Sequence, residues 1–203
     1  AAIEMGLVEA QEGETSVNIL AQNTQARVAC VVQTPARQVS YEGAARIDGV
    51  PGSSAPIAVQ FMETVGGITG AFLPTGNRVD EIDGIAVTCM DVAMPMVIAK
   101  AESFGLTGYE TAAELDENRA FFDQMEALRQ KAGALMGMGD VTKSVTPKFG
   151  LLALAKAGGT IATRYFMPWS THPSMAVTGA QCLASCVLTP GTIAEGMAAK
   201  SNE

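Results

Sequence analysis

The residues best suited to binding or proton chemistry lie in one stretch near the C-terminus. A polar loop with the single Trp and the single His of the chain leads into a run of small residues, and together they span 167–182. The small residues predict a helix with Pro173 in its first turn, where a missing N–H costs no hydrogen bond. Ser170, Thr171 and His172 would then surround the positive end of that helix, beside N–H groups without intrahelical partners. This arrangement favours a carboxylate or phosphate ligand.

The same residues also have a purely structural interpretation. Thr171 or His172 could cap a helix of the core by accepting a hydrogen bond from one of its first N–H groups. The residue pattern alone favours this capped helix. An anion site therefore needs support from elsewhere in the chain.

A second group of polar residues follows a long helical pattern. Lys143 and Lys148, with Ser144 and Thr146 between them, form the densest cationic and hydroxyl-bearing patch in an acidic chain. These groups could bind an anionic substrate. Lysines after a helix can equally complement the helix dipole, so both alternatives stay open. No Ser/His/Asp order, P-loop or dinucleotide glycine pattern accompanies them.

Composition excludes several classes of partner. A formal net charge of −8 and a pI near 4.7 argue against a nucleic-acid surface and against an anionic membrane. No apolar run approaches the ~18 residues that span a bilayer, and no signal peptide is visible. The four cysteines have no zinc-site spacing and no metal is predicted; they are Cys30, Cys89, Cys182 and Cys186. Buried free thiols in a reducing, cytoplasmic compartment are the better interpretation.

Strand patterns precede and follow one long helical pattern. Alternating or apolar segments predict strands at 16–20, 27–32, 38–41, 45–48, 57–62, 85–90, 94–98, 151–154 and 160–166. Pro95 favours an edge position or a bulge for its strand. Thr111 and Glu114 form a capping box, and apolar spacing extends one helical segment from there to about Met136.

Four segments together resemble a known family. They are 73–77, 82–95, 138–148 and 165–181, in the same order and within a likeness that covers essentially the whole chain. The chain is similar here to the family of 2-methylaconitate cis–trans isomerase, 4-oxalomesaconate tautomerase and methylitaconate isomerase. This resemblance implies an α/β (α+β) diaminopimelate-epimerase-like fold with two pseudo-symmetric halves, each a mixed β-sheet wrapped round a central helix. Residues 1–78 would finish the first half, and residues 79–203 would form most of the second.

The resemblance also implies a chemistry. Relatives transfer an allylic proton without a cofactor and so shift or isomerise a double bond in a small unsaturated di- or tricarboxylate. The catalytic Cys and Lys of relatives have no counterpart here, because both would lie upstream of Ala1. This chain would supply the opposite wall of the substrate site, from polar residues and from small ones that allow close approach: Lys143, Ser144, Ser170, Thr171, His172, Thr178 and Gly179.

Three functions follow from different interpretations of these residues. The leading one is an isomerase or tautomerase of the 4-oxalomesaconate or 2-methylaconitate type. The second is a carboxylate-binding or interaction fragment that does no chemistry, since the catalytic Cys and Lys of relatives are missing. Residues 1–8 read as the tail of a helix and predict an internal fragment. A two-thiol epimerase is disfavoured, because the loop 170–173 holds no Cys. The sequence does not choose among polycarboxylates, and it leaves a homo-oligomer open.

Overall fold

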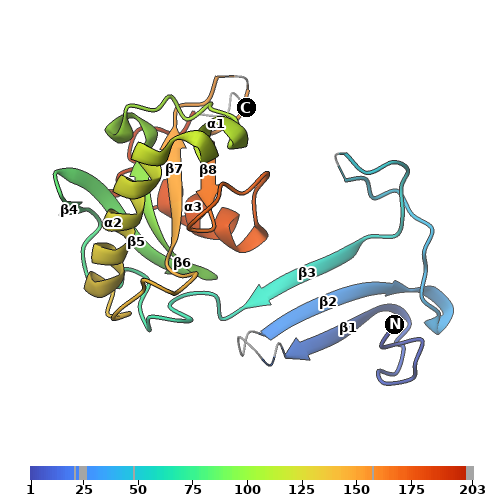
Figure 1. Cartoon of the computed structure of the whole chain (residues 1–203). Helices are drawn as coiled ribbons and strands as arrows, with labels where there is room; N and C mark the ends of the chain where they lie inside the picture. The colour runs from blue at the N-terminus through green and yellow to red at the C-terminus, as the bar shows by residue number, and fades with distance from the viewer. Residues whose placement is uncertain (21, 23–26, 48, 157, 200–203) are drawn as a thin grey trace. The chain divides into compact units, whose positions relative to one another are not determined.

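The structure is a computed structural model that describes residues 1–20, 22, 27–47, 49–156 and 158–199. The chain is mixed α+β and divides into two units, Ala1–Glu63 and Thr64–Glu203. Figure 1 shows that each unit has a sheet of its own. The predicted pair of halves, 1–78 and 79–203, stays a prediction.

The first unit is a three-stranded antiparallel sheet in the order β1-β2-β3. Its strands are β1 (Gly13–Leu20), β2 (Arg27–Thr34) and β3 (Ile57–Met62), and the 3-10 helix η1 (Pro35–Arg37) follows β2. The strand predicted at 38–41 does not form, because the Ser40 N–H is already bonded to the Gln33 carbonyl at the end of β2. Of the strand predicted at 45–48, Ala45 makes an isolated bridge to Ser54, and Asp48 lies outside the described residues.

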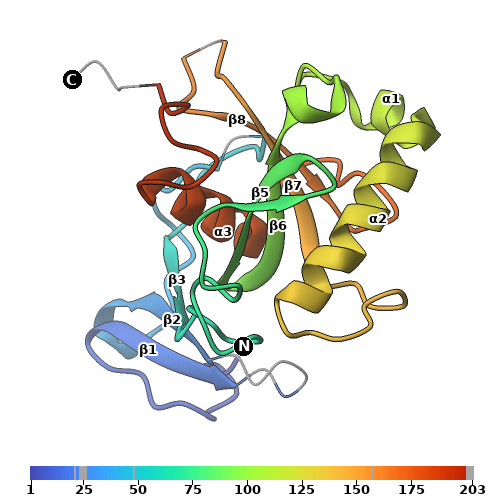
Figure 2. The same cartoon turned by 90° about the vertical axis from the view of Figure 1, so that its left-hand side faces the viewer.

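The second unit is a five-stranded sheet in the order β4-β5-β6-β7-β8, with helices on both faces. Its strands are β4 (Asp80–Ile82), β5 (Ile85–Val92), β6 (Met94–Lys100), β7 (Lys148–Ala153) and β8 (Ala162–Phe166). Its helices are η2 (Ala101–Phe104), α1 (Ala112–Glu117), α2 (Arg119–Leu135) and α3 (Val177–Leu188). Figure 2 shows α2 and α3 on opposite sides of the sheet. In the part of the chain that the structure describes, no helix is both long and apolar enough to cross a membrane.

Alternation along the central strands divides the core of this unit into two layers. In β6, Val97 and Ala99 pack in the layer beneath α2, whereas Met96 and Ile98 pack in the layer beneath α3. All four side chains are fully buried. The nearly continuous apolar sequence of β6 is therefore the signature of a strand covered on both faces.

Two predictions about these elements are wrong in detail. Pro95 does not put β6 at an edge, because β6 lies between β5 and β7. The proline is tolerated since pairing with β7 begins only at Met96. The single helix expected from Thr111 to Met136 is broken at Asn118, whose side chain accepts the Phe121 N–H and starts α2. The Thr111 capping box is confirmed.

The cysteines of the second unit are buried free thiols, as predicted. Burial raises the pKa of Cys89 and of Cys182 to about 12, and it also raises the pKa of Cys186. Because the thiolate is the reactive form, a thiol reagent at pH 8 should label no more than one cysteine, Cys30, quickly in the folded protein. All four should react after unfolding in guanidinium. Fast labelling of two or more thiols in the folded state would contradict this burial.

Candidate functional site

The loop between β8 and α3 turns back along the edge strand instead of entering a helix directly. Thr171 forms an isolated antiparallel bridge with Phe166, and the His172 N–H donates to the Tyr165 carbonyl over 2.8 Å. The helix begins at Val177, so the prediction that Pro173 lies in its first turn is wrong. The helix does not begin at Pro173 because the backbone just before it, at Thr171 and His172, is paired with β8.

The start of α3 has free donors and no side-chain cap. Neither Thr171 nor His172 caps it, so the capping interpretation is wrong. The first intrahelical bond runs from the Ala180 N–H to the Ala176 carbonyl. Within the described residues, the N–H groups of Val177, Thr178 and Gly179 have no hydrogen-bonded acceptor. These donors and the helix dipole favour an anion here, a few residues later than predicted.

The loop lines a pocket of about 420 Å³ together with the start of α1 and part of β8. Its lining residues are Glu110, Thr111, Ala112, Thr163, Arg164, Thr171, His172, Pro173, Ser174 and Met175. Two of the predicted substrate-binding residues, Thr171 and His172, are thus brought together. Ser170, Thr178, Gly179, Lys143 and Ser144 are not among the lining residues.

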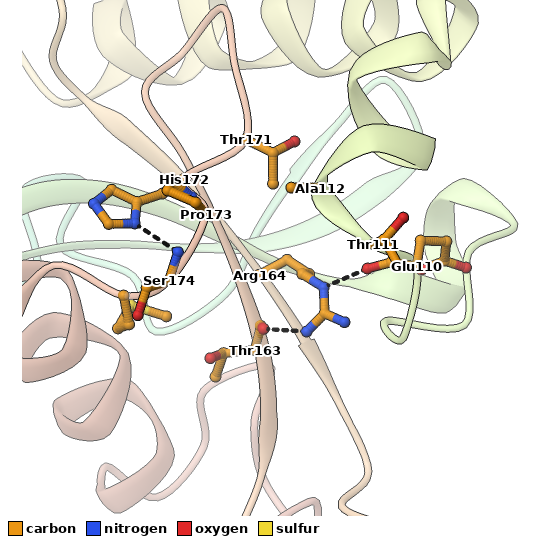
Figure 3. Close-up of a pocket in the computed structure, with 10 residues that line it drawn as sticks. Glu110, Thr111, Ala112, Thr163, Arg164, Thr171, His172, Pro173 and Ser174 are labelled. Carbon is orange, nitrogen blue, oxygen red and sulfur yellow. Dashed lines mark hydrogen bonds between the residues drawn. The ribbon is translucent and has the colours of Figure 1, made fainter. Parts of the chain in front are cut away.

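Arg164 is the cation of this pocket, and sequence reasoning did not single it out. Figure 3 shows its guanidinium group held between two backbone carbonyls. Its Nε donates to the Glu110 carbonyl over 2.7 Å, and its Nη1 donates to the Thr163 carbonyl over 2.9 Å. The side chain is half-buried. An arginine inside a strand pattern that alternates with apolar residues could have indicated this position.

Hydrogen bonds fix the other polar groups of the loop. The Ser174 N–H donates to Nδ1 of His172 over 3.0 Å, so the neutral imidazole carries its proton on Nε2. The Thr171 N–H donates to Asp116 of α1 over 2.7 Å. The Thr171 hydroxyl is buried and has no partner among the described residues. The loop is therefore bound to both α1 and β8, and one buried hydroxyl in it is left unpaired.

Gly179 is required by packing on a ring of β8. A Cβ at this position would lie 2.5 Å from Cε2 of Tyr165. Overpacking by the new methyl group would destabilise the fold by about 1–3 kcal/mol. The higher helix propensity of Ala than of Gly would stabilise it by about 1 kcal/mol. Gly179→Ala should therefore lower the free energy of unfolding by about 1 kcal/mol, as measured by urea denaturation.

Gly159→Ala is the matched control for that substitution. Its new methyl group would meet no atom closer than 3.9 Å. We expect this variant to be no less stable than the parent. Equal stability of the two variants would show that the contact with Tyr165 costs no more than the higher helix propensity of Ala contributes.

Lys143 and Ser144 lie in the segment between α2 and β7. Lys143 is exposed, and the Ser144 hydroxyl contacts Thr146. Burial and the nearby Arg129 charge lower the pKa of Lys148, which begins β7. The buried Arg129 guanidinium donates to the carbonyls of Val141 and Pro147 and so holds the middle and the end of this segment.

Two further groups of polar residues have structural partners. Asp91 is buried and accepts hydrogen bonds from the backbone of Ile68 and Thr69. The side chains of Thr75 and Asn77 both donate to Asp80, so their turn is held internally. Across the described residues, no group of three or more His, Cys, Asp or Glu is placed to hold a metal ion.

Comparison with known proteins places the chain in a family. The model of the PrpF protein family matches residues 1–203. The (4E)-oxalomesaconate Delta-isomerase of Novosphingobium sp. (strain KA1) is 44% identical over 197 residues, which are 97% of this chain and 55% of the relative. The 4-oxalomesaconate tautomerase of Pseudomonas putida is 42% identical over 200 residues, which are 98% of this chain and 55% of the relative.

A solved structure gives the same answer for the fold. The crystal structure of methylitaconate-delta-isomerase superposes with a TM-score of 0.84 at 28% sequence identity, covering 100% of this chain and 58% of that one. The chain thus spans a little over half the length of these proteins. The resemblance and the fold predicted from it are confirmed. The chain belongs to the PrpF protein family.

Proposed function

We propose that this chain forms one wall of the active site of an isomerase that acts without a cofactor on a small unsaturated di- or tricarboxylate. The observation that carries the proposal is the identity of 44% and 42%, over almost the whole chain, to proteins named for the isomerisation of 4-oxalomesaconate. A substrate of the 4-oxalomesaconate or 2-methylaconitate type is the specific form of the proposal.

The proposed reaction is an allylic proton transfer. A base removes a proton from the carbon next to the double bond, and the charge spreads onto the adjoining carboxylate as an enolate-like dianion. The same proton, or one from solvent, returns to another carbon of the allylic system, so atoms and charge balance. Donors aimed at the developing charge lower the barrier.

This wall contributes donors rather than the base. The free N–H groups at the start of α3 suit a carboxylate or enolate oxygen. Lys143, Ser144, Ser170, Thr171, His172, Thr178 and Gly179 stay the proposed substrate-binding residues. The buried thiols Cys89 and Cys182, with a pKa of about 12, are poor candidates for the proton-transfer group.

Proton exchange in heavy water tests the proposal. The chain, extended by the remaining segments of a full-length relative that supply the base, is incubated in D2O with 4-oxalomesaconate, 2-methylaconitate and 3-methylitaconate in turn, and deuterium entry at the allylic carbons is followed by NMR. We expect exchange with at least one substrate and slower exchange after Lys143→Gln. Lys131→Gln is the matched control, because Lys131 is an exposed lysine paired with Asp83. Binding without exchange would favour a carboxylate-binding module over an isomerase, and no binding would exclude both.

A further inference from the structure

Arg164 is a half-buried cation that has no carboxylate partner among the described residues. Its Nε and Nη1 are engaged by the carbonyls of Glu110 and Thr163. No ion pair to Arg164 and no acceptor for its Nη2 occur in the described part of the chain. Arg129 is the contrasting case, since its guanidinium is paired with Glu126 and with two carbonyls. Arg164 is therefore oriented by the backbone while part of its hydrogen-bonding capacity is left free.

The acidic residue of the same pocket does not neutralise Arg164. The Glu110 carboxylate accepts hydrogen bonds from the backbone of Thr107 and Gly108 and from the Thr107 hydroxyl, at 2.7–2.9 Å. Burial opposes ionisation, but these bonds outweigh it and hold the pKa of Glu110 below its usual value. Glu110 thus stays an anion, and its carboxylate is hydrogen-bonded within its own turn.

The cavity beside this guanidinium has the size of a metabolite site. Its volume of about 420 Å³ lies within the usual range of small-molecule pockets. The neighbouring loop supplies the Ser174 hydroxyl and the His172 ring, and Figure 3 shows their backbone beside the strand that carries Arg164. A fixed planar guanidinium next to hydroxyl groups matches a planar carboxylate.

We infer that Arg164 binds one carboxylate of the substrate in this pocket and is a specificity-determining residue. This inference rests on the proposed function. The ligand class is a small di- or tricarboxylate, with one carboxylate on the guanidinium and the unsaturated carbons beyond it. Inorganic phosphate, which a guanidinium group also binds, is the competing ligand and is one of the outcomes of the test.

Binding of trans-aconitate tests the role of Arg164 directly. Isothermal titration calorimetry compares the parent chain with Arg164→Gln, Arg164→Lys and Arg119→Gln. Hydrogen bonds to charged groups contribute about 1.5–3 kcal/mol, so Arg164→Gln should weaken binding roughly tenfold to a hundredfold. Arg164→Lys should recover only part of the loss, because lysine lacks the planar fork. Arg119→Gln removes the same charge from an exposed position outside the pocket and should leave affinity unchanged.

A measurement on the parent chain tests the inference without relying on the folding of a variant. The Nε–H signal of Arg164 in a ¹⁵N–¹H spectrum of the parent chain should shift on addition of trans-aconitate. It should not shift with the trimethyl ester of trans-aconitate, which has the same carbon skeleton but no carboxylate.

Three results would overturn the inference. They are no binding of trans-aconitate by the parent chain, unchanged affinity in a folded Arg164→Gln variant, and equal binding of inorganic phosphate or of the trimethyl ester. Measurements of proton exchange distinguish failure of this inference from failure of the proposed function. Exchange in the extended protein with an unchanged KM in its Arg164→Gln variant refutes the role of Arg164 alone. Arg164-dependent binding without exchange in the extended protein refutes the isomerase alone.

Discussion

Replacing Arg129 with Met should lower the free energy of unfolding by about 3–5 kcal/mol, because it leaves a partly buried carboxylate without its partner. Arg129 is fully buried, and its guanidinium makes two bonds of 2.7 Å to Glu126. The same group also donates to the carbonyls of Val141 and Pro147. Urea denaturation followed by circular dichroism measures the loss.

A double variant distinguishes loss of the ion pair from loss of the carbonyl contacts. Arg129→Met with Glu126→Leu removes both charges, so part of the stability should return. Recovery should be incomplete, since the Val141 and Pro147 carbonyls still lack their donor. A single variant as stable as the parent would contradict the assigned role of Arg129.

The ion pair also predicts how stability depends on pH. Burial tends to raise the pKa of Glu126, but hydrogen bonds from Arg129 and Gln130 outweigh it and lower the pKa below 4.5. A carboxylate with a lowered folded-state pKa stabilises the fold above its unfolded pKa, and this contribution disappears as the pH falls through the folded pKa. The difference in stability between the parent and Arg129→Met should therefore be constant from pH 6 to 8 and should shrink below pH 4.5.

Much of the second unit could be predicted because local patterns and packing agree there. The capping box at Thr111 and the apolar face that follows it predicted both ends of the helical region correctly. The break at Asn118 was missed, since an Asn within a helical pattern is common and its capping role depends on the turn in the backbone. Pro95 was misinterpreted because a pattern does not show at which residue the pairing between strands begins.

The candidate site could be predicted only in part. The loop residues Thr171 and His172 line one pocket, whereas Ser170, which was grouped with them, does not, and their role in binding substrate stays a prediction. Arg164 was missed, because its orientation depends on a hydrogen bond to the carbonyl of Glu110, which lies far away in the chain. The late start of α3 was also missed, because pairing of the loop with β8 is a long-range contact. The sequence shows which residues carry hydrogen-bond donors. The pairing of the strands determines which of these residues line the same cavity.

The second large effect is expected at Asp91, whose side chain holds the segment before β4. Asp91 is 1% exposed, and its Oδ2 accepts from the N–H groups of Ile68 and Thr69 and from the Thr69 hydroxyl, at 2.8–2.9 Å. Its backbone bonds to Gly66 and Phe72 on either side of them. Asp91→Ala should therefore cost about 2–5 kcal/mol of unfolding free energy, since three bonds to a charged acceptor are lost.

Hydrogen exchange shows whether that loss is local. The amides of Ile68 and Thr69 should exchange much faster in Asp91→Ala, whereas amides in α2 should keep protection up to the remaining global stability. Asp83→Ala is the control, because Asp83 is exposed and its pair with Lys131 contributes about 0–1 kcal/mol. If Asp91→Ala stays within about 0.5 kcal/mol of the parent and both amides stay protected, the segment is held by its backbone bonds alone. If the variant loses stability and only these amides are exposed, the buried carboxylate is what fixes the residues that lead into β4.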